Sequence, residues 1–270
     1  MSPAVRDIAA AKLNLALHVR GKRGDGRHNI ETVFAFCTDG DRLSAEAAGG
    51  LSLTVSGPFA PDLPADADNL VLKAARALRH EAAVSQGAAI HLDKKLPVAS
   101  GIGGGSADAA AALRLLTSLW QIDPKHASAV APTLGSDVPA CLLSLPAFGT
   151  GAGDELKPME LPDLVGKPVL LVNPRVELST AAVFAAWDGQ DLGPLGSWRQ
   201  ARNDLEAPAR ALVPQIETVL AWLSTQPGVE FTRMSGSGAT CFALFDSEEA
   251  RDLASDNVPR EWWRLATYLR

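Results

Sequence analysis

A glycine-rich stretch, residues 97–110, places the strongest constraint on how this chain can fold. It reads Pro-Val-Ala-Ser-Gly-Ile-Gly-Gly-Gly-Ser-Ala-Asp-Ala-Ala, follows a strand-like run over residues 88–92 and leads into a run of strong helix formers. Ser106 has the side chain expected of a helix N-cap. Such a loop presents backbone N–H groups at a helix N-terminus and favours an anion there. The stretch predicts a nucleoside triphosphate site, with an irregular connector as the alternative.

The loop fails to match three familiar motifs. A P-loop requires Lys followed by Ser or Thr after its last glycine, whereas Ser106 and Ala107 follow Gly105. A dinucleotide-binding fingerprint that began at Gly101 would need glycine at position 106. No Gly-x-Ser-x-Gly nucleophile elbow occurs either. The chemistry therefore has to be identified from residues elsewhere in the chain.

Composition argues against nucleic-acid and membrane partners. The 270 residues suffice for one large or two modest domains, and 47% hydrophobic with 21% charged residues is ordinary for a globular protein. The net charge of −6 and the lack of a basic run disfavour nucleic acid. No uncharged apolar run reaches the roughly 18 residues of a membrane helix. The 3 cysteines and 5 histidines are scattered, which predicts reduced thiols, a cytoplasmic location and no zinc site.

The expected strands and helices mix without regular alternation, which predicts an α+β fold. Hydrophobic periodicity places strands at residues 7–19, 29–36, 42–47, 51–56, 88–92, 168–173, 229–234, 240–245 and 262–269. It places helices at residues 70–83, from 106 onward, and at 124–134, 140–143, 179–187 and 247–255, the first capped by Asp68 and Asn69. Residues 203–208 lead into a further long helical pattern that ends near Ser224. Residues 148–155 are expected to be a flexible stretch near a domain junction.

Two charged residues become informative only in combination. Lys12 and Asn14 fall on one face of the first expected strand, and a lysine in such a place is usually solvated. Asp137 lies in the run Gly-Ser-Asp-Val-Pro, where a helix-capping carboxylate is the ordinary interpretation. Neither residue identifies a reaction by itself.

Four stretches together resemble the GHMP kinases. They are residues 11–15, 97–110, 135–139 and 234–239, and residues 97–106 match the family loop P-x-x-x-G-[LI]-G-x-[GS]-S at every position. The resemblance runs from about residue 9 to residue 245. It implies a two-domain α+β fold with a ribosomal protein S5 domain 2-like N-terminal domain over residues 1–155. A ferredoxin-like C-terminal domain would follow over residues 156–270.

Further stretches, residues 25–28, 68–70 and 203–206, narrow the resemblance within the family. The narrowed resemblance implies ATP-dependent phosphorylation of the 2-hydroxyl of 4-diphosphocytidyl-2-C-methyl-D-erythritol, in the non-mevalonate route to isoprenoid precursors. A monomer or homodimer is expected. Two alternatives remain: a GHMP kinase for a different small alcohol, and a non-catalytic small-molecule sensor on the same fold.

The resemblance also implies residue roles. Lys12 and Asp137 would be the catalytic pair, the carboxylate accepting the hydroxyl proton and the ammonium keeping it ionised and stabilising the transferring oxygens. Mg²⁺ would arrive with ATP and contact Ser106, with no dedicated carboxylate cage. The implied ATP-binding residues are Pro97, Val98, Ala99, Ser100, Gly101, Ile102, Gly103, Gly104, Gly105, Ser106, Ala107 and, near the adenine, Asn69. The implied substrate-binding residues are Asn14, Arg27, His28, Thr180 and Phe184.

Position 27 departs from the family pattern. Many members carry an aromatic residue, often Tyr, before the His of this motif, whereas this chain has Arg27. A guanidinium is planar and can stack on a base or bind a diphosphate. A solvated arginine is the alternative, so the contact to cytosine stays open at this position.

Overall fold

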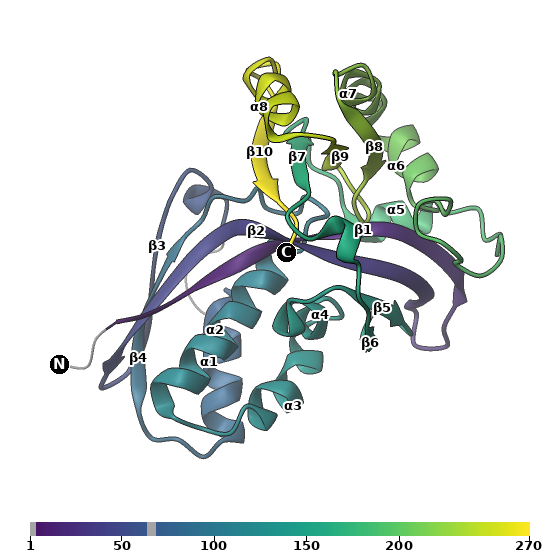
Figure 1. The fold of residues 1–270 in the computed structure, drawn as a ribbon. Coiled ribbons are helices and arrows are strands. Elements are labelled where there is room, and N and C mark those ends of the chain that lie inside the picture. Colours follow the sequence, from purple (N-terminus) through teal and green to yellow (C-terminus); the bar gives the residue numbers. More distant parts are fainter. Residues whose placement is uncertain (1–3, 64–68) are drawn as a thin grey trace. The chain divides into compact units, whose positions relative to one another are not determined.

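The computed structural model describes residues 4–63 and 69–270, and these divide into two compact units (Figure 1). The described residues of unit 1 fall within 1–11, 39–98 and 103–144, and those of unit 2 within 12–38, 99–102 and 145–270. Two long strands, β1 (Val5–Lys22) and β2 (His28–Ala48), contribute to both units. The expected domain boundary at residue 155 stays a prediction.

Strands β1 and β2 are longer and more deeply buried than the sequence pattern indicates. Both faces of β1 are buried from Ala9 to Val19, because its polar side chains find partners inside the protein. Strand β2 is one element where two were expected. Its continuity depends on Gly40, because a Cβ there would lie 1.9 Å from the carbonyl oxygen of Ala9.

Unit 1 places a group of helices beside a short sheet. Residues Arg42–Ala48 of β2 pair antiparallel with β4 (Gly87–Asp93), and β3 (Leu51–Ser56) pairs parallel with β4. Helix α1 packs on α2 and α3, and α2 packs on α4, as Figure 1 shows. The helices are α1 (Leu70–Glu81), α2 (Gly104–Trp120), α3 (Lys125–Leu134) and α4 (Val138–Leu143), and a short 3₁₀ helix, η1 (Ala60–Asp62), follows β3.

Two helix starts in unit 1 test the capping predictions. Asn69 caps α1, its side chain accepting a hydrogen bond of 2.9 Å from the N–H of Val71, while Asp68 lies outside the described residues. The N-cap expected at Ser106 is wrong. Helix α2 begins at Gly104, and its N-cap is Gly103 with φ 69°. Glycine adopts that left-handed conformation without steric cost, which lets the helix start earlier.

Unit 2 contains a four-stranded antiparallel sheet in the order β10-β7-β9-β8. The strands are β7 (Pro168–Asn173), β8 (Val229–Met234), β9 (Cys241–Phe245) and β10 (Trp263–Tyr268). Helices lie between β7 and β8 and between β9 and β10, which confirms the expected ferredoxin-like arrangement. These helices are α5 (Thr180–Ala185), α6 (Glu206–Leu212), α7 (Gln215–Ser224) and α8 (Glu248–Asp256), and the 3₁₀ helix η3 (Pro162–Leu164) precedes β7.

The long helix expected to follow residues 203–208 and to end near Ser224 is two helices, α6 and α7. Pro214 caps α7 and disfavours helical backbone at Val213, which has φ −132° and ψ 87°. The apolar face of α7 is nevertheless continuous with the core of unit 2. That core joins Ile216, Val219 and Leu223 to buried residues of β7 and β9.

The flexible stretch expected at residues 148–155 is instead a hairpin of β5 (Ala147–Thr150) and β6 (Glu155–Pro158). Strand β5 pairs with residues Thr32–Phe34 of β2. Glycine suits β5 because a Cβ at Gly149 would lie 2.7 Å from the Phe34 ring. Over the described residues, none of the helices combines the length and apolar character that a membrane crossing requires.

Candidate nucleotide and substrate sites

The first turn of α2, in unit 1, has the features of an anion site. The first backbone hydrogen bond of the helix runs from the N–H of Ala107 to the oxygen of Gly103, so the preceding N–H groups have no intrahelical acceptor. Gly105 is exposed, and no atom lies within 4 Å of where its Cβ would be. The N-cap provides no side-chain hydrogen bond. Backbone N–H groups at a helix start with room around them suit a phosphate.

The middle of the glycine-rich loop, residues 99–102, belongs to unit 2 and is tied there by backbone contacts. The N–H of Thr240 donates to Ser100 O at 3.1 Å, and the N–H of Lys12 donates to Ile102 O at 3.0 Å. The hydroxyl of Ser235 donates to Gly101 O at 3.1 Å. A Cβ on Gly101, whose φ is 77°, would lie 2.5 Å from backbone oxygens of residues 235 and 238. The loop therefore needs glycine where the second glycine-rich turn, residues 235–239, meets it.

Lys12 and Asn14 form a buried polar chain in unit 2. Lys12 Nζ donates to Asn14 Oδ1 at 2.8 Å, and Asn14 Nδ2 donates to Thr32 Oγ1 at 2.8 Å. Thr32 in turn donates to Ala16 O at 2.7 Å. The ammonium also lies 5.5 Å from the centroid of the Phe34 ring, a cation–π contact. The polar face of β1 is therefore no solvated face: Lys12 is 3% exposed.

Asp137 occupies the N-cap position of α4 in unit 1. Its side chain makes no capping hydrogen bond to that helix, so the ordinary interpretation as a helix-capping carboxylate is wrong. Asp137 and Lys12 belong to different units, and their catalytic pairing stays a prediction.

Two expected substrate residues, His28 and Phe184, come together in unit 2. Their rings stack with centroids 4.7 Å apart and an interplanar angle of 21°. A third ring, that of Trp187, meets His28 edge-on at 5.7 Å. Burial, and then the charge of Lys22, lower the pKa of His28, which favours the neutral imidazole. Sequence reasoning missed Trp187, although its position three residues after Phe184 on a helical pattern was a usable signal.

The remaining expected substrate residues have local partners. Thr180 Oγ1 lies 2.8 Å from Ser237 Oγ, which joins the start of α5 to the second glycine-rich turn. Arg27 sits on an exposed turn, where its guanidinium binds the Asp25 carboxylate at 2.9 Å and its backbone N–H donates to the same carboxylate at 3.0 Å. Arg27 therefore helps to shape the turn that precedes His28.

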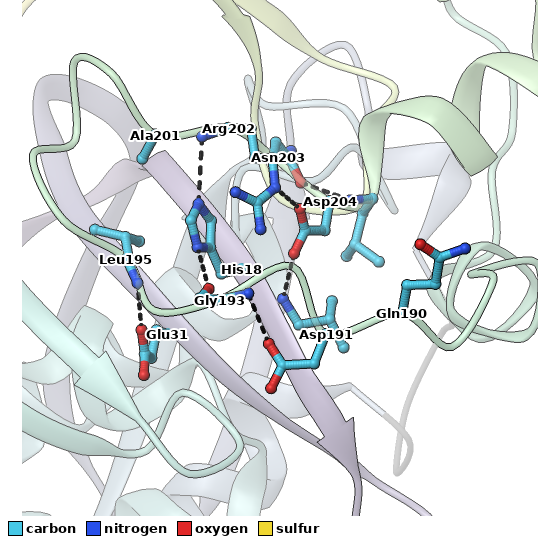
Figure 2. Close-up of polar contacts among 12 residues, drawn as sticks. His18, Glu31, Gln190, Asp191, Gly193, Leu195, Ala201, Arg202, Asn203 and Asp204 are labelled. Atoms are coloured by element: carbon cyan, nitrogen blue, oxygen red, sulfur yellow. Dashed lines mark hydrogen bonds and ion pairs between the residues drawn. The ribbon is translucent and has the colours of Figure 1, made fainter.

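A connecting segment, residues 186–205, links α5 to α6 and is fastened to β1 and β2 within unit 2 (Figure 2). The N–H of Arg202 donates to His18 Nε2 at 3.4 Å, and His18 Nδ1 lies 3.0 Å from Gly193 O. The N–H of Leu195 donates to Glu31 Oε2 at 2.6 Å. These contacts fix the chain that follows Phe184 and Trp187.

Asp204 completes this fastening (Figure 2). Its carboxylate accepts from Val19 N at 2.8 Å and from Arg202 Nε at 2.5 Å. Asn203 donates to Met234 O and Gly236 O at 2.9 and 2.8 Å. Residues 203–206, which are part of the family resemblance, therefore tie the second glycine-rich turn to the connecting segment. Within residues 4–63 and 69–270, no group of three or more His, Cys, Asp or Glu side chains is placed to hold a metal ion.

Comparison with known proteins agrees with this architecture. The family described as GHMP kinases N terminal domain matches residues 69–144, and GHMP kinases C terminal matches residues 182–264. A 4-diphosphocytidyl-2-C-methyl-D-erythritol kinase of Rhizorhabdus wittichii is 52% identical, covering 98% of this chain and 94% of its own length. One of the same name from Novosphingobium aromaticivorans is 50% identical, covering 98% and 93%.

Solved structures show the same relationship. The crystal structure of a 4-(cytidine 5'-diphospho)-2C-methyl-D-erythritol kinase aligns with a TM-score of 0.84 at 32% identity, covering 98% of this chain and 99% of that chain. A homoserine kinase from Cytophaga hutchinsonii aligns with a TM-score of 0.73 at 18% identity, which shows the shared fold alone. The fold and its glycine-rich loop define a small-molecule kinase of two α+β domains. The chain belongs to the GHMP kinases, as its motifs predict.

Proposed function

We propose that this chain transfers the γ-phosphoryl group of ATP to the 2-hydroxyl of 4-diphosphocytidyl-2-C-methyl-D-erythritol, in non-mevalonate isoprenoid precursor biosynthesis. The observation that carries the proposal is the 52% identity, over 98% of the chain, to a kinase of that name. The glycine-rich loop and the buried Lys12 support it, because a phosphoryl-transfer enzyme needs a phosphate cradle and a fixed cation.

The nucleotide is assigned to residues 97–107 and Asn69. The open first turn of α2 can accept phosphate oxygens without interference from Cβ atoms at Gly104 and Gly105. Mg²⁺ supplies charge neutralisation when it accompanies ATP, and the half-buried Ser106 hydroxyl is the protein group assigned to it. Asn69 has its side-chain oxygen engaged with Val71 N, which leaves its amide N–H₂ as the donor for an adenine nitrogen.

The proton transfer is assigned to Asp137 and the charge stabilisation to Lys12. A hydroxyl is a weak nucleophile until its proton is accepted, and a positioned carboxylate contributes about 10²–10⁴ in rate. Lys12 is held on β1 by Asn14, so its ammonium is oriented before substrate arrives. Preorganised charge of this kind acts on the transition state rather than on substrate binding alone.

The cytidyl end of the substrate is assigned to His28 and Phe184, with Asn14, Arg27 and Thr180 as further contacts. A neutral imidazole offers one donor and one acceptor to a pyrimidine edge. The aromatic rings around it offer the flat surface on which a base can lie. Arg27 is paired with Asp25 and stands at the position where the family resemblance implies an aromatic residue.

Cys37, Cys141 and Cys241 are buried thiols that form no disulfide, which supports a cytoplasmic location for this protein. We expect a monomer or a homodimer, which light scattering at micromolar concentration distinguishes.

The test is ADP release from ATP and Mg²⁺ in the presence of single candidate alcohols. We expect turnover with the cytidyl diphosphate substrate and at most traces with homoserine or mevalonate. Preferred turnover of another alcohol would identify a different GHMP kinase. Binding of the cytidyl substrate without ADP release would identify a non-catalytic sensor.

A further inference from the structure

Below the start of α2, unit 1 contains a buried ionic cluster that no step above uses. Lys94 Nζ lies 2.5 Å from Asp41 Oδ2 and 2.6 Å from Asp108 Oδ2. The three side chains are 1%, 0% and 3% exposed. They come from three elements: Asp41 from β2, Lys94 from the residue after β4, and Asp108 from α2. Charges this deeply buried are rare unless they have partners.

The cluster ties together the two ends of the glycine-rich loop. On the entry side, Asp41 Oδ1 accepts from the N–H groups of Lys95 and Leu96 at 2.5 and 2.8 Å. On the exit side, Lys94 binds Asp108 in the second turn of α2. One ionic cluster therefore holds the chain on both sides of the loop, at Lys95 and Leu96 before it and at Asp108 after it. Fixing the ends of a loop removes conformations that it would otherwise lose when a ligand binds.

The ammonium also lies directly under the first residue of the helix. A Cβ on Gly104 would be 3.2 Å from Lys94 Nζ, so the missing Cβ leaves space for the lysine ammonium. The missing Cβ also lets a phosphate approach the backbone at this residue. The loop needs such support because Ala99, which carries a Cβ, has left-handed backbone with φ of 50°. Strained backbone persists only where its surroundings hold it in place.

The protonation of the cluster follows from its burial. Burial alone would lower the pKa of Lys94, but the carboxylates of Asp108 and Asp41 outweigh it and raise that pKa, so the lysine stays charged. Burial raises the pKa of Asp108 to about 8, against the opposing charge of Lys94 and with the help of Asp41. Asp108 Oδ1 finds no hydrogen-bond partner among the described residues, which agrees with a protonated carboxyl. Around neutral pH Lys94 is therefore charged and Asp108 is protonated.

We propose that Lys94, held between Asp41 and Asp108, is a positioning residue that sets the phosphate-binding geometry of residues 97–107 and hence the affinity for ATP. The proposal rests on the assignment of that loop to the nucleotide. Loss of the Asp108 proton adds a negative charge close to the start of α2, where an incoming triphosphate is repelled. ATP affinity should therefore fall as the pH rises through about 8.

The first experiment compares neighbouring lysines by calorimetry with a non-hydrolysable ATP analogue and Mg²⁺. Lys94→Met should weaken binding by about tenfold or more, because a preorganised loop becomes free to reorder. Its KM for the cytidyl substrate should change much less. Lys95→Met is the matched control, because that side chain is 43% exposed and pairs at the surface with Asp93. A folded Lys94→Met protein that binds the analogue like the wild type overturns the proposal.

The second experiment uses Asp108→Asn, which keeps the shape and the neutral state of the protonated side chain. At about pH 7 its affinity for the analogue should match that of the wild type. As the pH rises to about 9, the affinity of the wild type should fall below that of Asp108→Asn. The comparison removes the contribution of the triphosphate's own titration. It also decides the matter if thermal melting shows that Lys94→Met does not fold. Identical pH profiles for the two proteins overturn the proposal.

Gly105→Val separates this inference from the assignment of the loop itself. The added side chain meets open space within the protein, so only the ligand is obstructed. If Gly105→Val binds the analogue normally, the loop is not the nucleotide site and both ideas fail. If it blocks binding while the Lys94 and Asp108 variants behave like the wild type, only the positioning role fails.

Discussion

Lys12 Nζ lies 2.8 Å from the amide oxygen of Asn14, two residues further along the same strand, and both side chains are buried. Successive residues of one parity share a strand face, so β1 itself sets this spacing. The relationship gives Lys12 a fixed direction and gives Asn14 a role beyond substrate contact. Substitutions at Lys12 and Asp137 test the phosphoryl transfer, and substitutions at Arg27 and His28 test substrate binding.

Lys12→Met should lower kcat by about 10²–10³, the loss found when one preorganised electrostatic donor is removed. Methionine has a similar length and can keep its contact with the Phe34 ring, so the protein should stay folded. Steady-state kinetics with both substrates saturating measures the effect. Lys157→Met, on the exposed strand β6, is the control and should behave like the wild type. A kcat within threefold of wild type removes Lys12 from the transition state.

Asp137→Asn should leave the fold intact, because α4 does not depend on a side-chain cap from this residue. The variant cannot accept a proton, so kcat should fall by about 10²–10⁴ while nucleotide affinity is retained. Single-turnover rates together with circular dichroism separate chemistry from folding. Asp123→Asn, at an exposed turn before α3, provides a matched change of charge. Near-normal turnover in folded Asp137→Asn would assign the base elsewhere.

Arg27→Ala should raise the KM for the cytidyl substrate and leave the KM for ATP nearly unchanged. The change removes the ion pair with Asp25 that shapes the turn before His28, together with any direct contact to the diphosphate. Arg23→Ala tests the same turn, because Arg23 also pairs with Asp25, at 3.5 Å. Arg27→Tyr should recover the KM if the position serves to stack on cytosine. An unchanged KM in Arg27→Ala returns the residue to a solvated role.

The lowered pKa of His28 predicts the pH range over which substrate binding is constant. Because burial and Lys22 lower this pKa from 6.5, the imidazole should stay neutral as the pH falls to 6.5 and gain a proton only below it. The KM for the cytidyl substrate should therefore rise only in that acidic range, and a His28→Gln variant should lack the rise. The folded protein binds fewer protons here than the unfolded chain, so stability also falls on acidification between 6.5 and the lowered pKa.

The elements predicted correctly from sequence are those in which local pattern and tertiary structure agree. Strand β7 has the predicted bounds, and α1 is capped by the predicted Asn69, because periodicity and capping chemistry are local signals. The hairpin of β5 and β6 was missed because its glycines were read as flexibility. In fact Gly149 is required by the packing of the Phe34 ring, which is far away in the sequence.

The candidate sites likewise depend on contacts between residues that are far apart in the sequence. Lys12 and His28 became candidates through the resemblance of short motifs to a known family, and the glycine-rich loop also through the affinity of a helix N-terminus for phosphate. Lys94 gave no such signal, since a lysine beside another lysine is normally solvated. Its burial depends on Asp41 and Asp108, which lie 53 and 14 residues away and come together only in the folded chain. The burial and the partners of such a positioning residue are visible in the folded structure and not in the local sequence.

The measurement that tests the central claim most directly is the identity of the phosphorylated product. The protein is incubated with ATP, Mg²⁺ and 4-diphosphocytidyl-2-C-methyl-D-erythritol, and the product is examined by phosphorus NMR and mass spectrometry. We predict one new phosphomonoester on the 2-hydroxyl, formed in equal amount to ADP and strongly reduced in Asp137→Asn. A phosphate on another hydroxyl, or ADP release without a new ester, would contradict the account.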